Sequence, residues 1–323
     1  MDAVEAISHA GDVLLSYLTN TDQRLQVGYL CTALLLACWV YRKSPSKRGL
    51  LRTIFNAKVW WSDSAKVDYK LVLFNGFVKV LLLTQFVTYG IHLAYWTSDT
   101  LAASLGSPLT GLDTTTCILL YTLAITLIGD LSVYVVHRAM HQIPSLWAFH
   151  SVHHSATTLT PVTQLRLHPV ELVINNARSI VVFGLITGTF HYAASGRIEL
   201  LTLFGANILS VAFFAFGANL RHSHIRLAYW HPLEKLLISP LQHQIHHSDN
   251  PQHHHRNYGA KLAVWDFLLG TWMPSRGIGT LIFGLGDGES HAQTLTDALI
   301  HPIRRGSPGD SVMDADLPVS EVA

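Results

Sequence analysis

The chain has 323 residues and a formal net charge of +1, with 49% hydrophobic and only 13% charged residues. Together with a mean hydropathy of +0.29, this composition is more apolar than is typical of a soluble protein of that length. No nucleic-acid motif is found, and the net charge argues neither for nor against an acidic partner. Cys31, Cys38 and Cys117 have no CxxC spacing, which argues against a disulfide framework or a cysteine metal site.

Apolar stretches long enough to cross a bilayer recur along the chain, since a spanning helix needs about 20 residues. We expect five, at Leu25–Tyr41, Leu71–Trp96, Thr116–Val136, Leu172–Phe190 and Ile198–Leu220. Lys79, Arg178 and Glu199 interrupt three of them, so a buried core helix or a re-entrant segment is the alternative for any single stretch. As a set they predict an all-α, integral-membrane helical bundle.

Lysines and arginines are concentrated between the first two predicted spans, at Arg42, Lys43, Lys47, Arg48, Arg52, Lys58, Lys66 and Lys70. The connection from Thr97 to Thr115 has Asp99 and Asp113 but no Lys or Arg. The positive-inside rule therefore places the first connection in the cytoplasm and the second outside it. Following the chain through the remaining spans predicts a multi-pass protein with a histidine-rich helical cap on the cytoplasmic face.

Eight histidines fall into three short clusters: His137-x-x-x-His141, His150-x-x-His153-His154 and His243-x-x-His246-His247. Residues three and four apart lie on one face of a helix, so each cluster can aim two or three imidazoles at one point. Eight imidazoles are more than one metal ion can use. Such clusters are not expected in an ordinary hydrophobic core, because every buried imidazole ring needs hydrogen-bond partners.

Ligand type alone does not select the metal, because imidazole suits Zn, Cu, Fe and Ni. Structural zinc needs four ligands, often with Cys, and soluble di-iron bundles use Glu, which the clusters lack. Nitrogen-rich ligation of two ions beside a membrane fits oxygen activation for attack on an unactivated C–H bond. Amino-acid side chains cannot perform that chemistry, so a metal must supply it.

The motifs His137-Arg138-Ala139-Met140-His141, His150-Ser151-Val152-His153-His154 and His243-Gln244-Ile245-His246-His247 resemble the three histidine boxes of the fatty acid hydroxylase/sterol desaturase superfamily. Arg166-Leu167-His168-Pro169 and the run from Asn257 to Thr271 fit the same pattern, and the resemblance covers roughly Asp130 to Pro274. It implies a membrane-bound, non-haem di-iron oxygenase that uses O₂ and two electrons on a lipid. Two iron ions are then expected, held by His137, His141, His150, His153, His154, His222, His243, His246 and His247.

His222 enters that set as the family's additional ligand, in Arg221-His222-Ser223-His224. Three further residues are candidates for the metal or for its ligands: His224, His168 and Asp130. Asp130 lies seven residues before His137 on the same helical face, and a metal-bound histidine usually donates its second N–H to such a group. The run His253-His254-His255 is interpreted as a solvated loop.

Three regions are expected: a membrane region with a basic cytoplasmic loop (1–114), the catalytic domain (115–275) and a partly disordered C-terminal tail (276–323). The chain shows no reductase motif, so electrons are expected from a separate ferredoxin- or cytochrome-type donor with its reductase. A sterol, fatty acyl chain, ether lipid or carotenoid would all fit, and hydroxylation and desaturation both stay open. The alternative is a histidine-rich metal transporter or storage protein, although a transporter needs ligands along a path near the membrane midplane.

Overall fold

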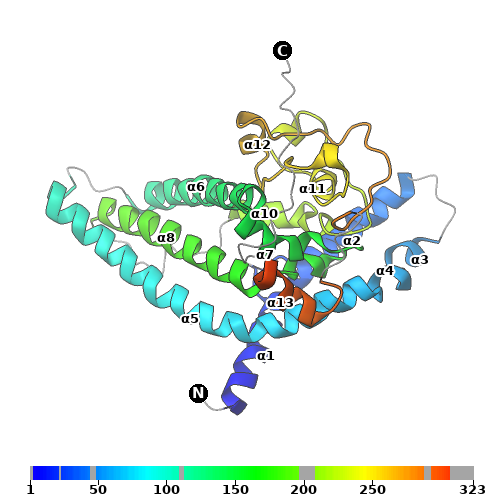
Figure 1. Ribbon diagram of the computed structural model, residues 1–323. Helices are drawn as coiled ribbons and strands as arrows, with labels where there is room; N and C mark the ends of the chain where they lie inside the picture. The colour runs from blue at the N-terminus through cyan, green and yellow to red at the C-terminus, as the bar shows by residue number, and fades with distance from the viewer. Residues whose placement is uncertain are drawn as a thin grey trace.

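The computed structural model describes residues 3–21, 23–43, 49–108, 113–195, 208–286 and 292–305 (Figure 1). Within these ranges the elements are helices, and the β-type pairing consists of two isolated bridges, Leu237–Leu262 and Ser248–Phe283. The predicted all-α fold class is confirmed.

Three helices are long and apolar enough to cross a membrane: α5 (Asp63–Leu105), α6 (Thr114–Gln142) and α8 (Pro169–Ala193). They lie side by side in Figure 1 and form a membrane helical bundle. Each begins at a capped residue, because the side chains of Ser62, Asp113 and His168 accept a hydrogen bond from a first-turn backbone N–H. Many of their leucines and valines are exposed, which a bilayer accommodates and water does not.

These three helices contain the second, third and fourth predicted spans. The first predicted span corresponds to α2 (Val27–Lys43), an apolar helix of 17 residues that is shorter than those three. The fifth lies partly outside the described residues. Its described part forms α10 (Ile208–Ala215) and then breaks at Gly217, whose φ of 93° ends the helix. The prediction of a regular span reaching Leu220 was therefore wrong.

A Gly184-x-x-x-Gly188 motif brings α8 into close contact with α5. A Cβ on Gly184 would lie 2.7 Å from the Cβ of Leu93, and one on Gly188 would collide with the carbonyl oxygen of Ala94. Small residues four apart let two helix backbones approach closely, which favours helix association in a bilayer. The spacing therefore explains why α5 and α8 form the principal helix pair of the bundle.

The remaining helices surround the bundle and cover one end of it. They are α1 (Ala3–Thr19), α3 (Leu50–Ile54), α4 (Ala57–Trp60), α7 (Pro144–His154), α11 (Pro240–His246), α12 (Val264–Leu268) and α13 (Leu295–Arg305), with short 3₁₀ turns η1 (Pro161–Leu165), η2 (Ala218–Leu220), η3 (Leu233–Lys235) and η4 (Pro251–His253). In Figure 1, α7 and α11 lie near the end of α6 that carries the first histidine cluster. We call this end of the molecule, built from α7 and residues 218–286, the cap.

A buried ion pair fastens the segment after α7 to the first turns of α5. Arg166 donates to Asp68 at 2.8 Å, and both side chains are at most 1% exposed. Its other hydrogen bonds reach the carbonyls of Ser64, Val152 and Ala292 and the hydroxyl of Ser155. One fully satisfied guanidinium thus ties together α5, α7 and the segment that leads into α13, which positions the second histidine cluster against the bundle.

Candidate metal centre

The three histidine clusters lie on helix ends that local sequence signals place close together. His137 and His141 occupy the last turns of α6, and Pro144 starts α7, whose last turns carry His150, His153 and His154. The third cluster lies on α11, which begins with Pro240 after a capping box between Ser239 and Gln242. The end of α6 and the cap together therefore bring all eight predicted box histidines to one place.

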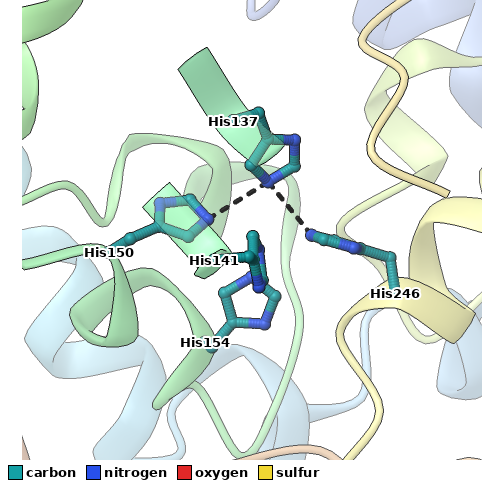
Figure 2. A group of neighbouring side chains, drawn as sticks. All are labelled: His137, His141, His150, His154 and His246. Atoms are coloured by element: carbon teal, nitrogen blue, oxygen red, sulfur yellow. Dashed lines mark hydrogen bonds between the residues drawn. The ribbon is translucent and has the colours of Figure 1, made fainter. Parts of the chain in front are cut away.

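The structure sorts these side chains, together with His222, into two groups. The first group contains His137, His141, His150, His154 and His246, whose nitrogens lie within 4.8 Å of one another. Figure 2 shows these rings converging, with Nε2 of His137 3.1 Å from Nε2 of both His150 and His246. We call this group cluster A.

The second group, cluster B, contains His153, His222, His243 and His247, all of them buried. Nε2 of His222 lies 3.0 Å from Nε2 of His247, 3.1 Å from that of His243 and 3.2 Å from that of His153. The two clusters adjoin, because the His154 ring of cluster A stacks on His247 with centroids 4.4 Å apart.

The division between the clusters follows helical geometry. Each pair spaced i, i+4 stays together: His137 with His141 and His150 with His154 in cluster A, and His243 with His247 in cluster B. The middle histidine of each longer motif belongs to the other cluster: His153 lies in cluster B and His246 lies in cluster A. Cluster A therefore draws ligands from three helices, and cluster B from two helices and the turn that holds His222.

The nitrogen positions fit a cation in cluster A. Nδ1 of His137 donates to the carbonyl of Tyr258 at 2.7 Å, and Nδ1 of His246 donates to that of Arg256 at 2.8 Å. Carbonyls only accept, so both rings keep their proton on Nδ1 and present a lone pair at Nε2. These two lone pairs face each other at 3.1 Å with no proton between them, and nitrogens bound about 2.0–2.1 Å from one ion lie roughly 3 Å apart.

The facing lone pairs are not relieved by protonation of the rings near neutral pH, because these imidazoles stay neutral there. Burial lowers the pKa of His246 to about 3. Burial also holds the pKa of His222, His243 and His247 well below the ordinary value, and neighbouring charges lower it further. Within the described part of the chain, Nε2 of His141 and of His154 is buried without a hydrogen-bond partner. Neutral imidazoles with inward-facing lone pairs are what a metal ion requires.

Two buried carboxylates support the histidines, and sequence reasoning missed both. Oε2 of Glu171 lies 3.1 Å from Nδ1 of His150. Asp266 accepts from the backbone N–H groups of Tyr258 and Gly259, and so holds the carbonyl that His137 contacts. Glu171 stands three residues after His168 in the first turn of α8, a position that could have been noticed as a buried acid beside a histidine motif.

Asp130 does not support a histidine, contrary to the prediction. Its carboxylate is 4% exposed and accepts from the backbone N–H groups of Lys261 and Leu262 and from the indole of Trp265. It therefore fastens α6 to the loop before α12. The seven-residue spacing from His137 was read correctly as one helical face, but on that face Asp130 meets the segment 261–265, whose three N–H donors bond to its carboxylate.

His168 and His224 lie outside both clusters, so their prediction as metal or near-metal residues was wrong. His168 caps α8, with Nδ1 accepting from Val170 N–H and Nε2 donating to the carbonyl of Leu299 at 3.1 Å. His224 donates from Nε2 to the carbonyl of Thr53. The hydrogen bonds of both rings go to backbone groups. The bond from His168 to Leu299 joins α8 to α13, and the bond from His224 to Thr53 joins the cap to α3.

The run from His253 to His255 is only partly a solvated loop. His254 and His255 are exposed, as expected, but His253 is 7% exposed and its Nδ1 lies 3.0 Å from the hydroxyl of Ser248. None of the three belongs to either cluster.

A cavity leads from the membrane helices to the clusters. Its larger part, about 550 Å³, lies between α5, α6 and α8 and the segment before α2. A smaller part of about 140 Å³ is lined by His137 and His150 of cluster A and by His153, His222 and His243 of cluster B. The two parts share Arg24, Val133, Gln164, Leu167, Asn175 and Ala260. The part among the membrane helices thus adjoins the part that residues of both clusters line.

The fatty acid hydroxylase family model matches residues 122–271. This stretch contains most of α6 and all of α7, α8 and α11, and it includes all nine clustered histidines. The resemblance predicted from the histidine motifs is confirmed, because residues 122–271 match the fatty acid hydroxylase family.

Several known proteins are similar to part of this chain. Ornithine lipid hydroxylase OlsE of Rhizobium tropici is 28% identical over 145 residues, which cover 45% of this chain and 39% of the relative. Alkylglycerol monooxygenase of Danio rerio is 28% identical over 156 residues, 48% of this chain and 31% of the relative. Fatty acid hydroxylase vlmA of a Lecanicillium species is 27% identical over 154 residues, 45% of this chain and 40% of the relative.

The matched part of this chain spans less than half the length of each of these relatives. No solved structure matches the chain. The comparisons support a lipid-acting, membrane-associated oxidoreductase.

Proposed function

We propose that this protein is a membrane-bound, non-haem di-iron oxidoreductase that hydroxylates or desaturates a lipid. The observation that carries the proposal is the pair of adjoining histidine clusters, in which Nε2 atoms face one another about 3 Å apart. Between His137 and His246 no proton is available to be shared, because both rings carry theirs on Nδ1. Nine neutral imidazoles suit two metal ions, and the fatty acid hydroxylase match favours iron over zinc or copper.

The iron pair, when bound, would supply the O₂ chemistry that side chains lack. Hydroxylation combines R–H, O₂, two electrons and two protons to give R–OH and one water. Desaturation uses the same O₂, electrons and protons, removes two hydrogens from the lipid and gives two waters. Both reactions begin at an unactivated C–H bond, and the relatives whose names state an activity are hydroxylases or monooxygenases. We therefore favour hydroxylation.

The chain's own residues orient the ligands and keep water out. The carbonyls of Tyr258 and Arg256 set the ring tautomers of His137 and His246, and the carboxylate of Glu171 lies 3.1 Å behind Nδ1 of His150. Asp266 anchors the Tyr258 backbone. Such contacts behind the ligands fix ring orientation and raise ligand basicity.

The substrate would enter from the bilayer. A lipid tail gains about 0.8 kcal/mol for each CH₂ that it keeps out of water, so it resists leaving the hydrocarbon. The cavity between α5, α6 and α8 lies among the helices able to cross the membrane, which lets the tail remain in an apolar environment. Two electrons would come from a separate ferredoxin- or cytochrome-type donor on the cytoplasmic side, which is where the cap would lie if the basic segment between α2 and α5 follows the positive-inside rule.

The test is to purify the full chain in a neutral detergent, measure its iron and supply a lipid extract with O₂, a donor and the donor's reductase. We expect about two irons per chain and a lipid that is heavier by one oxygen. A lipid lighter by two hydrogens would identify a desaturase within the same proposal. Metal uptake into proteoliposomes, with no lipid product in the complete donor system, would overturn the proposal in favour of a transporter.

A further inference from the structure

The larger cavity contains more positive than negative charge. Arg24, Arg178 and Lys261 line it, whereas Asp130 is its one acidic lining residue among the described part of the chain. The carboxylate of Asp130 already accepts three hydrogen bonds, two from backbone N–H groups and one from the indole of Trp265. It interacts electrostatically with both guanidiniums, yet it cannot balance three cations.

The two arginines have only uncharged partners of their own. Arg178 donates to the hydroxyls of Ser132 and Ser179, and its Nε is buried without a partner. The guanidinium of Arg24 lies 5.7 Å from the Phe214 ring and makes no side-chain hydrogen bond to the residues that the structure describes. Both arginines are half-buried, and a guanidinium that is removed from water without a directly paired carboxylate is costly, so an anion between them would reduce that cost.

Arg24 stands where the two parts of the cavity meet. It lines both the larger cavity and the smaller one beside the histidines, and its charge acts on His222 of cluster B. Arg178 is two turns along α8 from Glu171, which contacts His150 of cluster A. The cationic part of the cavity is therefore close to the metal centre.

The opposite part of the larger cavity is apolar. Phe86 of α5, Ile125 of α6 and Val182 and Phe183 of α8 line it, and the rings of Phe86 and Phe183 contact each other with centroids 5.5 Å apart. From the histidine clusters outwards, the cavity is thus lined first by cationic side chains and then by apolar side chains. A total of about 550 Å³ is within the range of pockets that enclose most of a small ligand.

We infer that Arg24 and Arg178 form a subsite for the anionic oxygens, phosphate or carboxylate, of a lipid headgroup. The lipid tail then lies against Phe86, Ile125, Val182 and Phe183, away from the histidines. This inference rests on the proposed function and names its substrate class: an anionic lipid whose oxidised carbon is near the headgroup rather than at the end of the tail. Guanidiniums suit this role because their planar donors pair with two oxygens of one anion.

The experiment measures equilibrium binding to the purified full chain in a neutral maltoside detergent. Three probes separate the contributions: hexadecyl phosphate has tail and anion, hexadecanol has the tail alone, and inorganic phosphate has the anion alone. We expect hexadecyl phosphate to bind roughly tenfold or more tightly than hexadecanol, since charge-assisted hydrogen bonds are the strong ones. Inorganic phosphate should compete only weakly.

Arg24→Gln and Arg178→Gln should each reduce the affinity for hexadecyl phosphate about tenfold and leave the affinity for hexadecanol unchanged. Arg24→Lys keeps the charge and should retain most of the preference. Arg226→Gln is the matched control, because Arg226 is exposed and lies outside both cavities. Retained iron and retained hexadecanol binding show that a variant is folded.

Equal affinity for hexadecyl phosphate and hexadecanol would overturn the inference, as would an unchanged preference in both Gln variants. Inorganic phosphate competing as well as hexadecyl phosphate would assign the site to a free anion instead of a lipid. Binding requires neither iron nor turnover, so these results do not depend on whether the proposed oxidation is observed.

Discussion

Oε2 of Glu171 lies 3.1 Å from Nδ1 of His150, and the two side chains are 6% and 3% exposed. The contact joins the first turn of α8 to the last turns of α7. It does not have the geometry of a hydrogen bond, so its effect is electrostatic: a negative charge behind the ring favours electron density at Nε2, the nitrogen that faces cluster A. An acid on a membrane helix thus supports a histidine of the cap.

We predict that Glu171→Gln weakens iron binding, because the amide keeps the shape of the side chain but loses its charge. Loss of a group behind a ligand typically lowers metal affinity about 10–100-fold. Iron retention can be measured by competition with a chelator of known affinity. Asp99→Asn, at an exposed position on α5, should retain the original affinity, and an unchanged affinity in Glu171→Gln would show that the contact has no role in binding.

The division into two clusters predicts different results for two histidines only two residues apart. His222→Ala should remove one of four cluster B nitrogens, lower the iron content from about two towards one per chain and abolish activity. His224→Ala is the matched control, because His224 contacts the carbonyl of Thr53, and it should keep both irons. Metal analysis of the purified variants decides between these outcomes, and equal iron loss in both would refute the division.

Single changes in each cluster should leave insertion intact. His153→Ala in cluster B and His246→Ala in cluster A should both abolish activity, while each variant still fractionates with membranes. The physical reason is that α5, α6 and α8 owe their insertion to apolar side chains, not to the histidines. Full activity in either variant would contradict the assignment of that residue as a ligand.

Acid should destabilise the metal-free protein. The unfolded chain binds a proton at His246 near pH 6.5, whereas burial lowers the folded-state pKa to about 3. Stability is therefore complete above about pH 6.5 and falls as the pH decreases towards 3. For His246 alone the slope is about 1.4 kcal/mol per pH unit.

Urea unfolding of the metal-free protein in neutral detergent at pH 7, 6 and 5 measures this slope. His246→Ala should reduce it by about one proton, because the titrating group is gone. His231→Ala, at an exposed position, should leave it as it is. An unfolding free energy that stays constant between pH 7 and 5 would contradict the buried, neutral state of these rings.

Close packing of α5 and α8 predicts that Gly188→Ala is harmful. Its new methyl group would collide with the backbone carbonyl of Ala94, which cannot move without shifting the helix, and overpacking typically costs about 1–3 kcal/mol. Gly129→Ala on α6 is the matched control, since nothing lies within 4 Å of its position. Thermal denaturation in detergent should show a lower midpoint for Gly188→Ala alone.

Membrane orientation can be tested with single cysteines in a background without Cys31, Cys38 and Cys117. Arg52→Cys in α3 and Ser104→Cys near the end of α5 are exposed positions on opposite sides of the predicted bilayer. A membrane-impermeant label added from the non-cytoplasmic side should reach position 104 and not position 52. The reverse pattern would place the cap outside the cytoplasm, away from the proposed electron donor.

Sequence alone was enough for the fold class, the three long apolar helices and all nine clustered histidines. These features are local: hydrophobic length specifies a membrane helix, and i, i+3 and i, i+4 spacing specifies which rings share a helical face. The family motif added His222, which stands in a turn where no periodic pattern exists. The family match over residues 122–271 then confirmed the resemblance.

Only the tertiary structure decided which metal cluster each histidine joins, because that depends on how α6, α7 and α11 pack against one another. His153 and His154 are neighbours in sequence and belong to different clusters. The same reason explains the wrong predictions for His168, His224 and Asp130: each is polar and near a motif, yet its partner is a backbone group from a distant segment. The contact between Glu171 and His150 and the cationic end of the cavity both depend on how α8 packs beside α6 and α7. Contacts between different helices produce no regular residue spacing in the sequence, so neither could be predicted from it.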